Sequence, residues 1–472
     1  MERRAFLRAS AVGVSLSGAA TVTTARTGSA TARQASYEPL GRVDIEAAAE
    51  AVVGDDGDTA YLATTTGFAT VDVSDPAEPT VLAERDVEIG GESLRNVLDV
   101  SVDGDRLVVA GPANPGYEPM GVRCYDVRDP AEPTPVDEYE TDFHIHNCTL
   151  AGDRLFVAEN DFETGTNALA IFDVADGIEQ VGSWSLLDRE PGWRDRPFLG
   201  RYLHDVTVQD DVAYLPYWNA GTYLVDVSDP TAPAYVSHVA DTTLEAQRGA
   251  GRDDTVYGLP GNDHYAAVDE AGDLLAVGRE AWATGGDAPD RPGEIDLYDV
   301  SDPAEPVHRG SIDPPRTDAE RYADGEWTTS HNFDLRNDRL YSSWYRGGVK
   351  IHDVSDPNEP EQLAWWRDPD ETAFWTARVA VPGETFVASS TEAIPTTALE
   401  GALYTFPIES GEQADPPSLR DPDPSNGSDG NGAGDDTASD DSIPGFTGLA
   451  ALAGGAAGLE WLRRRGNGNV QD

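Results

Sequence analysis

Basic side chains are scarce in this chain of 472 residues, which has 33 lysines and arginines against 86 aspartates and glutamates. Lys350 is its only lysine, and the formal net charge is -53. Nucleic-acid binding requires basic side chains that neutralise phosphates, so we expect no nucleic-acid partner. The acidic residues are spread along the whole chain. This pattern is typical of a halophilic archaeon, whose surface carboxylates keep proteins hydrated in salt that screens their repulsion.

Cysteine and local catalytic motifs are also rare. Cys124 and Cys148 are the only cysteines, and the sequence leaves open whether they form a disulfide, which needs Cα atoms within ~7 Å. The chain has no phosphate-binding glycine loop, no Gly-x-Ser-x-Gly and no His-Glu-x-x-His. Any chemistry must therefore come from residues that the fold brings together.

One fragment, Asp-Val-Ser-Asp-Pro, recurs through the chain in clean or worn copies. Its first aspartates are Asp72, Asp126, Asp173, Asp226, Asp299 and Asp353. Successive copies lie 47 to 73 residues apart, and a seventh, eroded copy is expected near Phe406. Self-similarity at such a period indicates the blades of a propeller or the turns of a solenoid.

Each repeat contains four alternating apolar segments separated by Gly, Asp and Pro turns, which predicts four antiparallel strands. Seven such units predict an all-β, seven-bladed β-propeller over residues 33–410. The last unit, residues 376–408, supplies only three strands. Residues 38–45 have the pattern of the missing fourth, so we expect this N-terminal strand to close the ring and hide two open sheet edges.

These repeats resemble the LVIVD-repeat family, whose units end a hydrophobic strand with Val-Asp-Val-Ser-x-Pro. The resemblance covers roughly residues 38 to 409. It implies the propeller fold but no settled catalytic residues, and propellers host many unrelated activities.

The N-terminus, residues 1–32, resembles a twin-arginine export signal. Arg3 and Arg4 are followed by Phe6-Leu7 and a weakly apolar stretch, and cleavage would leave a mature start near Arg33. Because this route exports folded proteins, it permits a cofactor inserted in the cytoplasm.

The C-terminus has two further segments. Residues 411–442 consist mainly of Asp, Ser, Gly, Asn and Pro, which predicts a disordered acidic stalk. Residues 443–472 contain Pro444-Gly445-Phe446, an apolar run and Arg463-Arg464-Arg465, and resemble the PGF-CTERM sorting signal of archaeal surface proteins. The resemblance implies export and sorting machinery as partners. It also implies attachment to the membrane through this segment or a lipid, with the propeller exported and displayed at the cell surface.

Four of the eight histidines fall at one equivalent position when the repeats are aligned on their second strands. They are His146, His204, His264 and His331, at the start of the first strand in units three to six. First strands line the channel of a propeller, so these imidazoles should converge, and imidazole sets bind zinc, copper or iron. Asp205 and Asp263 are candidate further ligands or hydrogen-bond acceptors. The alternative is that each histidine caps its strand through hydrogen bonds to the backbone.

The turns after the second strands should share the channel face with these histidines. They carry aromatic, acidic and basic residues that are typical of a ligand pocket: Trp218, Asn219, Arg279, Glu280, Trp344 and Arg346. The alternative is packing between blades.

Three functions fit these features. The first is a surface propeller that binds a ligand or partner through its histidine-lined face. The second is a metal-dependent oxidoreductase or hydrolase that uses the histidine cluster. The third is a structural protein of the cell envelope.

Overall fold

The computed structural model describes residues 36–286, 289–392, 394 and 399–420. The segments predicted as export signal (1–32) and sorting signal (443–472) lie outside these residues, as does the stalk beyond residue 420. In the described residues, no helix is long and apolar enough to cross a membrane.

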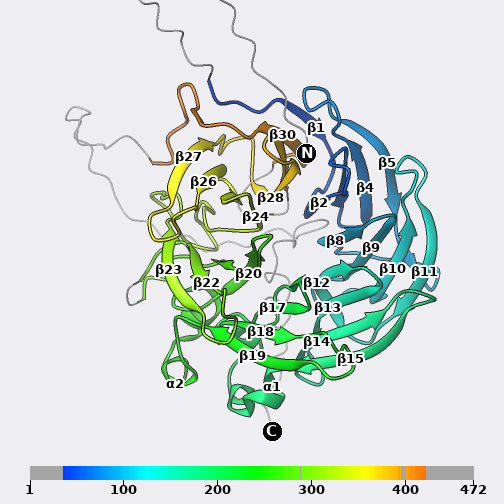
Figure 1. Ribbon diagram of the computed structural model, residues 1–472. Helices are drawn as coiled ribbons and strands as arrows, with labels where there is room; N and C mark the ends of the chain where they lie inside the picture. Colours follow the sequence, from blue (N-terminus) through cyan, green and yellow to red (C-terminus); the bar gives the residue numbers. More distant parts are fainter. Residues whose placement is uncertain (1–35, 287–288, 393, 395–398, 421–472) are drawn as a thin grey trace, which may run out of the picture. The chain divides into compact units, whose positions relative to one another are not determined.

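The described chain forms seven four-stranded antiparallel sheets, arranged as the blades of a β-propeller (Figure 1). Blade 1 contains β2 (Ala51–Val53), β3 (Thr59–Ala63), β4 (Gly67–Asp72) and β5 (Thr80–Asp86). Blade 2 contains β8 (Asp99–Asp103), β9 (Arg106–Gly111), β10 (Gly121–Asp126) and β11 (Thr134–Glu140). Blade 3 contains β12 (His144–Ala151), β13 (Arg154–Asp161), β14 (Thr166–Asp173) and β15 (Glu179–Ser185). The hairpin of β6 (Glu88–Ile89) and β7 (Glu92–Ser93) lies between blades 1 and 2 in the sequence.

The remaining blades repeat this order. Blade 4 contains β16 (Thr207–Gln209), β17 (Val212–Pro216), β18 (Thr222–Asp226) and β19 (Ala234–Val239). Blade 5 contains β20 (Asp263–Val268), β21 (Leu274–Arg279), β22 (Ile295–Asp299) and β23 (Val307–Ile312). Blade 6 contains β24 (Phe333–Arg336), β25 (Arg339–Ser343), β26 (Val349–Asp353) and β27 (Glu361–Trp366). Blade 7 contains β28 (Phe374–Val381), β29 (Thr385–Ser390), β30 (Ala402–Pro407) and the N-terminal β1 (Gly41–Asp44).

Two inter-blade connections carry short helices. Between blades 3 and 4 lie α1 (Leu186–Arg189) and the 3-10 turns Pro191–Asp195 and Phe198–Arg201. Between blades 4 and 5 lie α2 (Leu244–Gln247) and α3 (Arg252–Tyr257). Both connections fall within long insertions of the sequence; α1 packs against β14 and β15 of blade 3, and α3 packs against the turn Phe198–Arg201.

Strand β1 closes the ring, as the sequence predicts. It pairs antiparallel with β30 from Gly41 opposite Thr405 to Asp44 opposite Ala402. Its pairing protects the outer edge of blade 7, which would otherwise expose unpaired backbone groups. Beyond residue 410, β31 (Gly411–Glu412) pairs with β27, so the ordered sheet extends two residues into the segment predicted as stalk.

The aspartates of the repeated fragment are structural. Asp72 Oδ1 accepts hydrogen bonds from the backbone N–H of Ser74 (2.9 Å) and from its hydroxyl (2.6 Å), and the same pair of bonds recurs at Asp299 and Asp353. These bonds hold the turn that ends the third strand. They also lower the pKa of Asp72.

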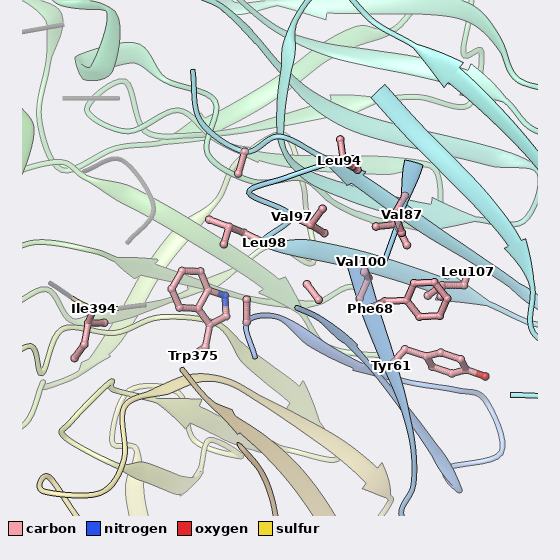
Figure 2. Close-up of a cluster of buried hydrophobic side chains, with 14 of the residues drawn as sticks. Tyr61, Phe68, Val87, Leu94, Val97, Leu98, Val100, Leu107, Trp375 and Ile394 are labelled. Atoms are coloured by element: carbon pink, nitrogen blue, oxygen red, sulfur yellow. The ribbon is translucent and has the colours of Figure 1, made fainter. Parts of the chain in front are cut away.

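The core lies between neighbouring blades. Phe68 of blade 1 packs edge-on against Tyr125 of blade 2, with ring centroids 4.8 Å apart. Figure 2 shows Phe68 within one of these buried clusters, which also includes Leu98 and Trp375. Cys124 and Cys148 are buried in another cluster and both are free, so they form no disulfide with each other.

Candidate metal centre in the channel

Local irregularities turn two consecutive side chains of the inner strands toward the channel. The ladder between β12 and β13 shifts register between Ile145 and Cys148, and the one between β20 and β21 shifts between Asp263 and Tyr265. A bulge re-aims a side chain that strict alternation would send to the other face. In blades 3 and 5 the bulges therefore bring the histidine position and the position after it to the channel, whereas in blades 4 and 6 both positions precede the first strand.

The four predicted histidines form a continuous row, which we call the imidazole row. The ring centroids of His146 and His204 are 4.0 Å apart, those of His204 and His264 3.8 Å, and those of His264 and His331 4.4 Å. All four are buried. They come from blades 3, 4, 5 and 6, so the alignment of the repeats placed them together correctly. In blades 1, 2 and 7 the same position is held by Ala49, Leu98 and Trp375.

Several nitrogens of this row are buried without a hydrogen-bond partner. They are His146 Nε2, both ring nitrogens of His204 and His264 Nδ1, as judged over the described residues. At the ends of the row, His146 Nδ1 faces Asn147 Oδ1 at 2.5 Å, and His331 Nδ1 faces the carbonyl oxygen of Trp375 at 2.6 Å. Because these oxygens only accept, each Nδ1 carries the proton and each Nε2 keeps a free lone pair. This is the tautomer of a metal-ligating histidine.

The row is neutral at physiological pH. Burial lowers the pKa of His146 to about 4 and that of His264 to about 3. Burial and the neighbouring imidazoles hold the pKa of His204 and His331 well below the usual value. Neutral imidazole is the form that binds a cation.

Glu280 supplies a carboxylate to this row. It follows β21, and its Oε1 accepts a hydrogen bond of 2.6 Å from the hydroxyl of Tyr345. Its Oε2 lies 3.4 Å from His264 Nδ1. Ligand atoms of His204, His264 and Glu280 all lie within 4.8 Å of one another. Burial raises the pKa of Glu280, which makes its ionised form dependent on a nearby positive charge.

Aromatic side chains surround the row. Trp218 stacks on His204 with centroids 5.1 Å apart, and Tyr202 packs edge-on against His146 at 5.7 Å. Trp375 contacts His331 at 4.2 Å, and Tyr345 does so at 4.8 Å. These walls exclude water, and electrostatic interactions inside them are stronger than at the surface.

The six residues predicted from the turns divide into two groups. Trp218 and Glu280 contact the imidazole row, as described above. The side chains of the other four make hydrogen bonds or ion pairs with other residues of the protein and do not contact the imidazole row. Asn219 donates to the carbonyl of Thr255 (2.6 Å), Arg279 pairs with Asp296 (2.5 Å) and Asp263 (3.3 Å), Trp344 donates to Ser342 (2.8 Å), and Arg346 donates to the carbonyl of Pro369 (2.7 Å). These contacts hold loops and blade edges together.

A second layer, of which sequence reasoning named only Asp205, lies next to the imidazole row. It consists of the residues that follow the histidine position in each blade: Glu50, Asp99, Asn147, Asp205, Tyr265, Asn332 and Thr376. They are equivalent because they lie opposite the same position of the second strand in their blades. Asp99 lies opposite Ala110, Tyr265 opposite Gly278 and Thr376 opposite Ser389. We call this layer the oxygen ring, since it offers only oxygen and amide groups. Aligning the residue after each histidine would have found it.

The residues of the oxygen ring other than Thr376 line a pocket of about 70 Å³. Arg378 is the basic residue that lines it, and this side chain donates to Glu50 (2.7 Å), to the hydroxyl of Tyr265 (2.5 Å) and to the carbonyl of Phe333 (2.7 Å). The two layers are connected, because Asn147 bonds both His146 and Asp205 (2.6 Å).

Two segments of the chain, residues 56–85 and 200–241, match the LVIVD repeat. These segments fall in blade 1 and around blade 4, and the seven blades described above show that the protein is a β-propeller. The β-propeller domain of Cps50 (Swd1) from Myceliophteria thermophila is 11% identical with a TM-score of 0.54, covering 79% of this chain and 99% of that one. The Pan2 WD40 domain from Neurospora crassa is 8% identical with a TM-score of 0.48, covering 80% and 98%. At such identities the first likeness shows the fold alone. No curated protein matches the sequence.

Proposed function

We propose that this propeller binds a transition-metal ion in its channel through His146, His204, His264 and His331. The observation that carries the proposal is His204. This imidazole is fully enclosed between two other imidazoles, and neither of its nitrogens has a hydrogen-bond partner in the described part of the chain. A buried polar atom left without a partner costs about 1–3 kcal/mol, and a metal ion would remove that cost for several nitrogens at once.

The spacing supports an ion shared by neighbouring imidazoles, and the ligand atoms of His204, His264 and Glu280 are the ones that lie within 4.8 Å of one another. A metal–nitrogen distance of about 2.0–2.1 Å puts the ring centroids of neighbouring ligands roughly 4.5–5 Å apart. The observed separations of 3.8–4.4 Å are slightly shorter, so small outward movements of the rings would admit an ion. Strand capping, the alternative, accounts for His331, which bonds the carbonyl of Trp375, but not for His204.

Zinc, copper and iron suit a donor set of neutral imidazoles. Elemental analysis decides between metal binding and a structural cluster. The protein should be purified, treated with a chelator, reloaded separately with Zn²⁺, Cu²⁺ and Fe²⁺, and desalted. We expect one ion per chain for at least one metal, and we expect His204→Ala to lose it. His308→Ala should retain it, because His308 lies on β23, the outer strand of blade 5, and its side chain is half exposed. Equal metal content in the two variants would contradict the proposal.

A metal-dependent enzyme is the second candidate function, and Glu280 favours it. Two imidazoles and one carboxylate within 4.8 Å resemble the set that holds non-haem iron with open coordination positions. Iron-loaded protein that consumes dioxygen in the presence of a reductant, and loses this activity but not its iron in Glu280→Gln, would support catalysis. Iron without any turnover would leave binding as the function.

The site would act outside the cell. The twin-arginine and PGF-CTERM resemblances support export and attachment at the surface, and a pathway for folded proteins suits a cofactor that is enclosed by the fold. Replacing Arg3 and Arg4 with lysine should retain the precursor in the cytoplasm, as measured by fractionation. A protein that carries no metal and is still displayed would instead favour the structural envelope role.

A further inference from the structure

We propose that a series of tyrosine and tryptophan rings carries single electrons from the protein surface to the ion of the imidazole row. With iron in the row, the protein then reduces hydrogen peroxide with electrons from donors that stay outside the channel. The proposal rests on the transition-metal site proposed above and adds an activity to it. We call Tyr345, Trp327 and Trp282 the aromatic relay.

The inner part of the relay starts at the end of the imidazole row. The ring centroids of His331 and Tyr345 are 4.8 Å apart, and those of Tyr345 and Trp327 are 5.2 Å apart. Aromatic rings whose centroids are about 4.5–7 Å apart are in contact. Tyr345 and Trp327 are both fully buried. Electron transfer in proteins slows steeply as the gap between donor and acceptor widens, so rings in contact favour it.

The outer part of the relay leads toward the surface. Trp327 lies in the long connection between β23 and β24, and its ring centroid is 4.7 Å from that of Trp282. Trp282 is buried. Two partly exposed tyrosines, Tyr257 and Tyr322, pack on it with centroid distances of 6.4 Å and 4.9 Å. Trp282 is therefore one ring away from side chains that reach the solvent.

The residue types of the relay suit electron transfer. Indole and phenol rings lose an electron far more readily than the phenyl ring of Phe, and the relay consists of indole and phenol rings. The opposite end of the imidazole row differs. There Tyr202 contacts His146, but the rings that follow it outward are Phe198, at 5.9 Å from Tyr202, and Phe162, at 4.1 Å from Phe198. Of these two ends, the one at Tyr345 offers a continuous series of oxidisable rings.

Packing does not account for the choice of tryptophan at position 282. Trp282 Nε1 is buried and has no hydrogen-bond partner among the described residues. A buried indole N–H usually finds a partner, and leaving it without one costs about 1–3 kcal/mol. An apolar side chain would fill this part of the core without that cost. An oxidisable ring needs no such partner, because a tryptophan that loses an electron can keep its proton.

The burial of the row makes a relay necessary. The four imidazoles are 2–3% exposed, so a large electron donor cannot touch an ion that they hold. Hydrogen peroxide takes up two electrons and two solvent protons, its O–O bond breaks, and two water molecules form. Each electron comes from a separate donor molecule, which is oxidised at the outer end of the relay.

The relay residues return to their starting state after each transfer. Trp327 keeps its proton while it is oxidised, because its Nε1 donates to the carbonyl oxygen of Tyr322 (2.9 Å), which is not a base. The hydroxyl proton of Tyr345 shifts along its hydrogen bond to Glu280 Oε1 (2.6 Å) and returns when the electron is replaced. The net reaction therefore consumes only peroxide, protons and donor electrons.

Ferrocytochrome c is the probe for this activity. This basic protein is too large to enter the channel, and the acidic surface attracts it. Iron-loaded, desalted protein is mixed with hydrogen peroxide and ferrocytochrome c, and the loss of the reduced-haem absorption is followed. We expect the wild type to oxidise two cytochromes per peroxide, and His204→Ala, treated in the same way, to show no more than the rate without protein.

Two substitutions of one residue test the relay itself. Trp327→Phe and Trp327→Tyr remove the same indole and leave rings of nearly equal size, but only tyrosine is readily oxidised. A tenfold change in rate corresponds to about 1.4 kcal/mol in the barrier, and the difference in ease of oxidation is larger, so Trp327→Phe should lose about tenfold or more. Trp327→Tyr should keep most of the rate. Trp193→Phe, at a buried tryptophan of another cluster, should oxidise the cytochrome as the wild type does.

Electron paramagnetic resonance gives a readout that does not depend on turnover. Without a donor, peroxide must draw electrons from the relay, so frozen samples of the iron-loaded wild type should contain a tryptophan radical that Trp327→Phe lacks. Iron content, measured in every variant, separates the two proposals. Equal rates in Trp327→Phe and Trp327→Tyr at wild-type iron content would overturn the relay and leave the metal site standing. A wild type that binds no redox-active ion would overturn both.

Discussion

Arg378 links four blades across the channel, so its removal should be costly. The side chain, 17% exposed, extends from blade 7 and binds Glu50 next to blade 1, Tyr265 of blade 5 and the carbonyl of Phe333 of blade 6. Arg378→Met keeps most of the apolar stem but leaves Glu50 as a buried charge without its cation. Breaking a buried pair in this way costs about 3–5 kcal/mol. The partial exposure of Arg378 places the expected loss near the lower end, at about 3 kcal/mol.

Urea unfolding at pH 7 in a chelating buffer of fixed salt measures this loss. A double-mutant cycle with Glu50→Gln isolates the pair, because Gln still accepts and donates hydrogen bonds without a charge. We expect a coupling energy of roughly 2 kcal/mol, within the range for contacting residues. A loss below about 1 kcal/mol for Arg378→Met, or full additivity of the two substitutions, would refute the view that this ion pair holds the channel together.

Three further predictions concern closure, pH and the imidazole row. Deleting residues 36–46 removes β1 with the buried Tyr37 and Ile45, which should lower the free energy of unfolding by about 5 kcal/mol or more. This loss is comparable to the total stability of many domains. An unchanged melting temperature would contradict ring closure by β1. In the absence of a cation, stability should fall as the pH rises from 5 to 8. Folded Asp99, with a pKa raised to about 8, holds a proton that the unfolded chain has already released, and urea midpoints for Asp99→Asn should show a flatter profile. Tyr345→Phe removes the hydroxyl that bonds Glu280 and should cost about 1–3 kcal/mol by urea unfolding, whereas Tyr404→Phe, away from the row, should cost less.

The repeats made it possible to predict the fold from the sequence. The Asp-Val-Ser-Asp-Pro fragment marks the end of the third strand in the clean units, and counting its copies with an eroded seventh predicted seven blades. The closing strand was predicted because the last unit supplies only three strands and residues 38–45 have the pattern of the fourth. The same register brought four histidines from blades 3 to 6 to one place. Periodicity carries this information because blades 1 to 6 repeat the same hydrogen-bonded turn, as at Asp72 and Asp353.

The oxygen ring, apart from Asp205, was missed for a physical reason. Strict alternation along a strand sends the residue after each histidine away from the channel, so it gives no reason to expect Asn147 there. The bulge between Ile145 and Cys148 breaks this alternation, and single sequences carry no reliable signal for such a bulge. Likewise, the pairing of Arg279 with Asp296 depends on a neighbouring strand, which turn composition alone does not reveal.

Closure by β1 also brings the ends of the described chain together. The backbone N–H of Ala414 donates to the hydroxyl of Ser36 at 2.7 Å, and that of Tyr37 donates to the carbonyl of Glu412 at 2.9 Å. A linker of very few residues could join these ends at little entropic cost. The chain could then be opened at another exposed Asp-Pro turn, such as the one after Asp226. Where the polypeptide starts is thus a matter of gene order rather than of folding, and any of several circular permutants should build the same seven blades.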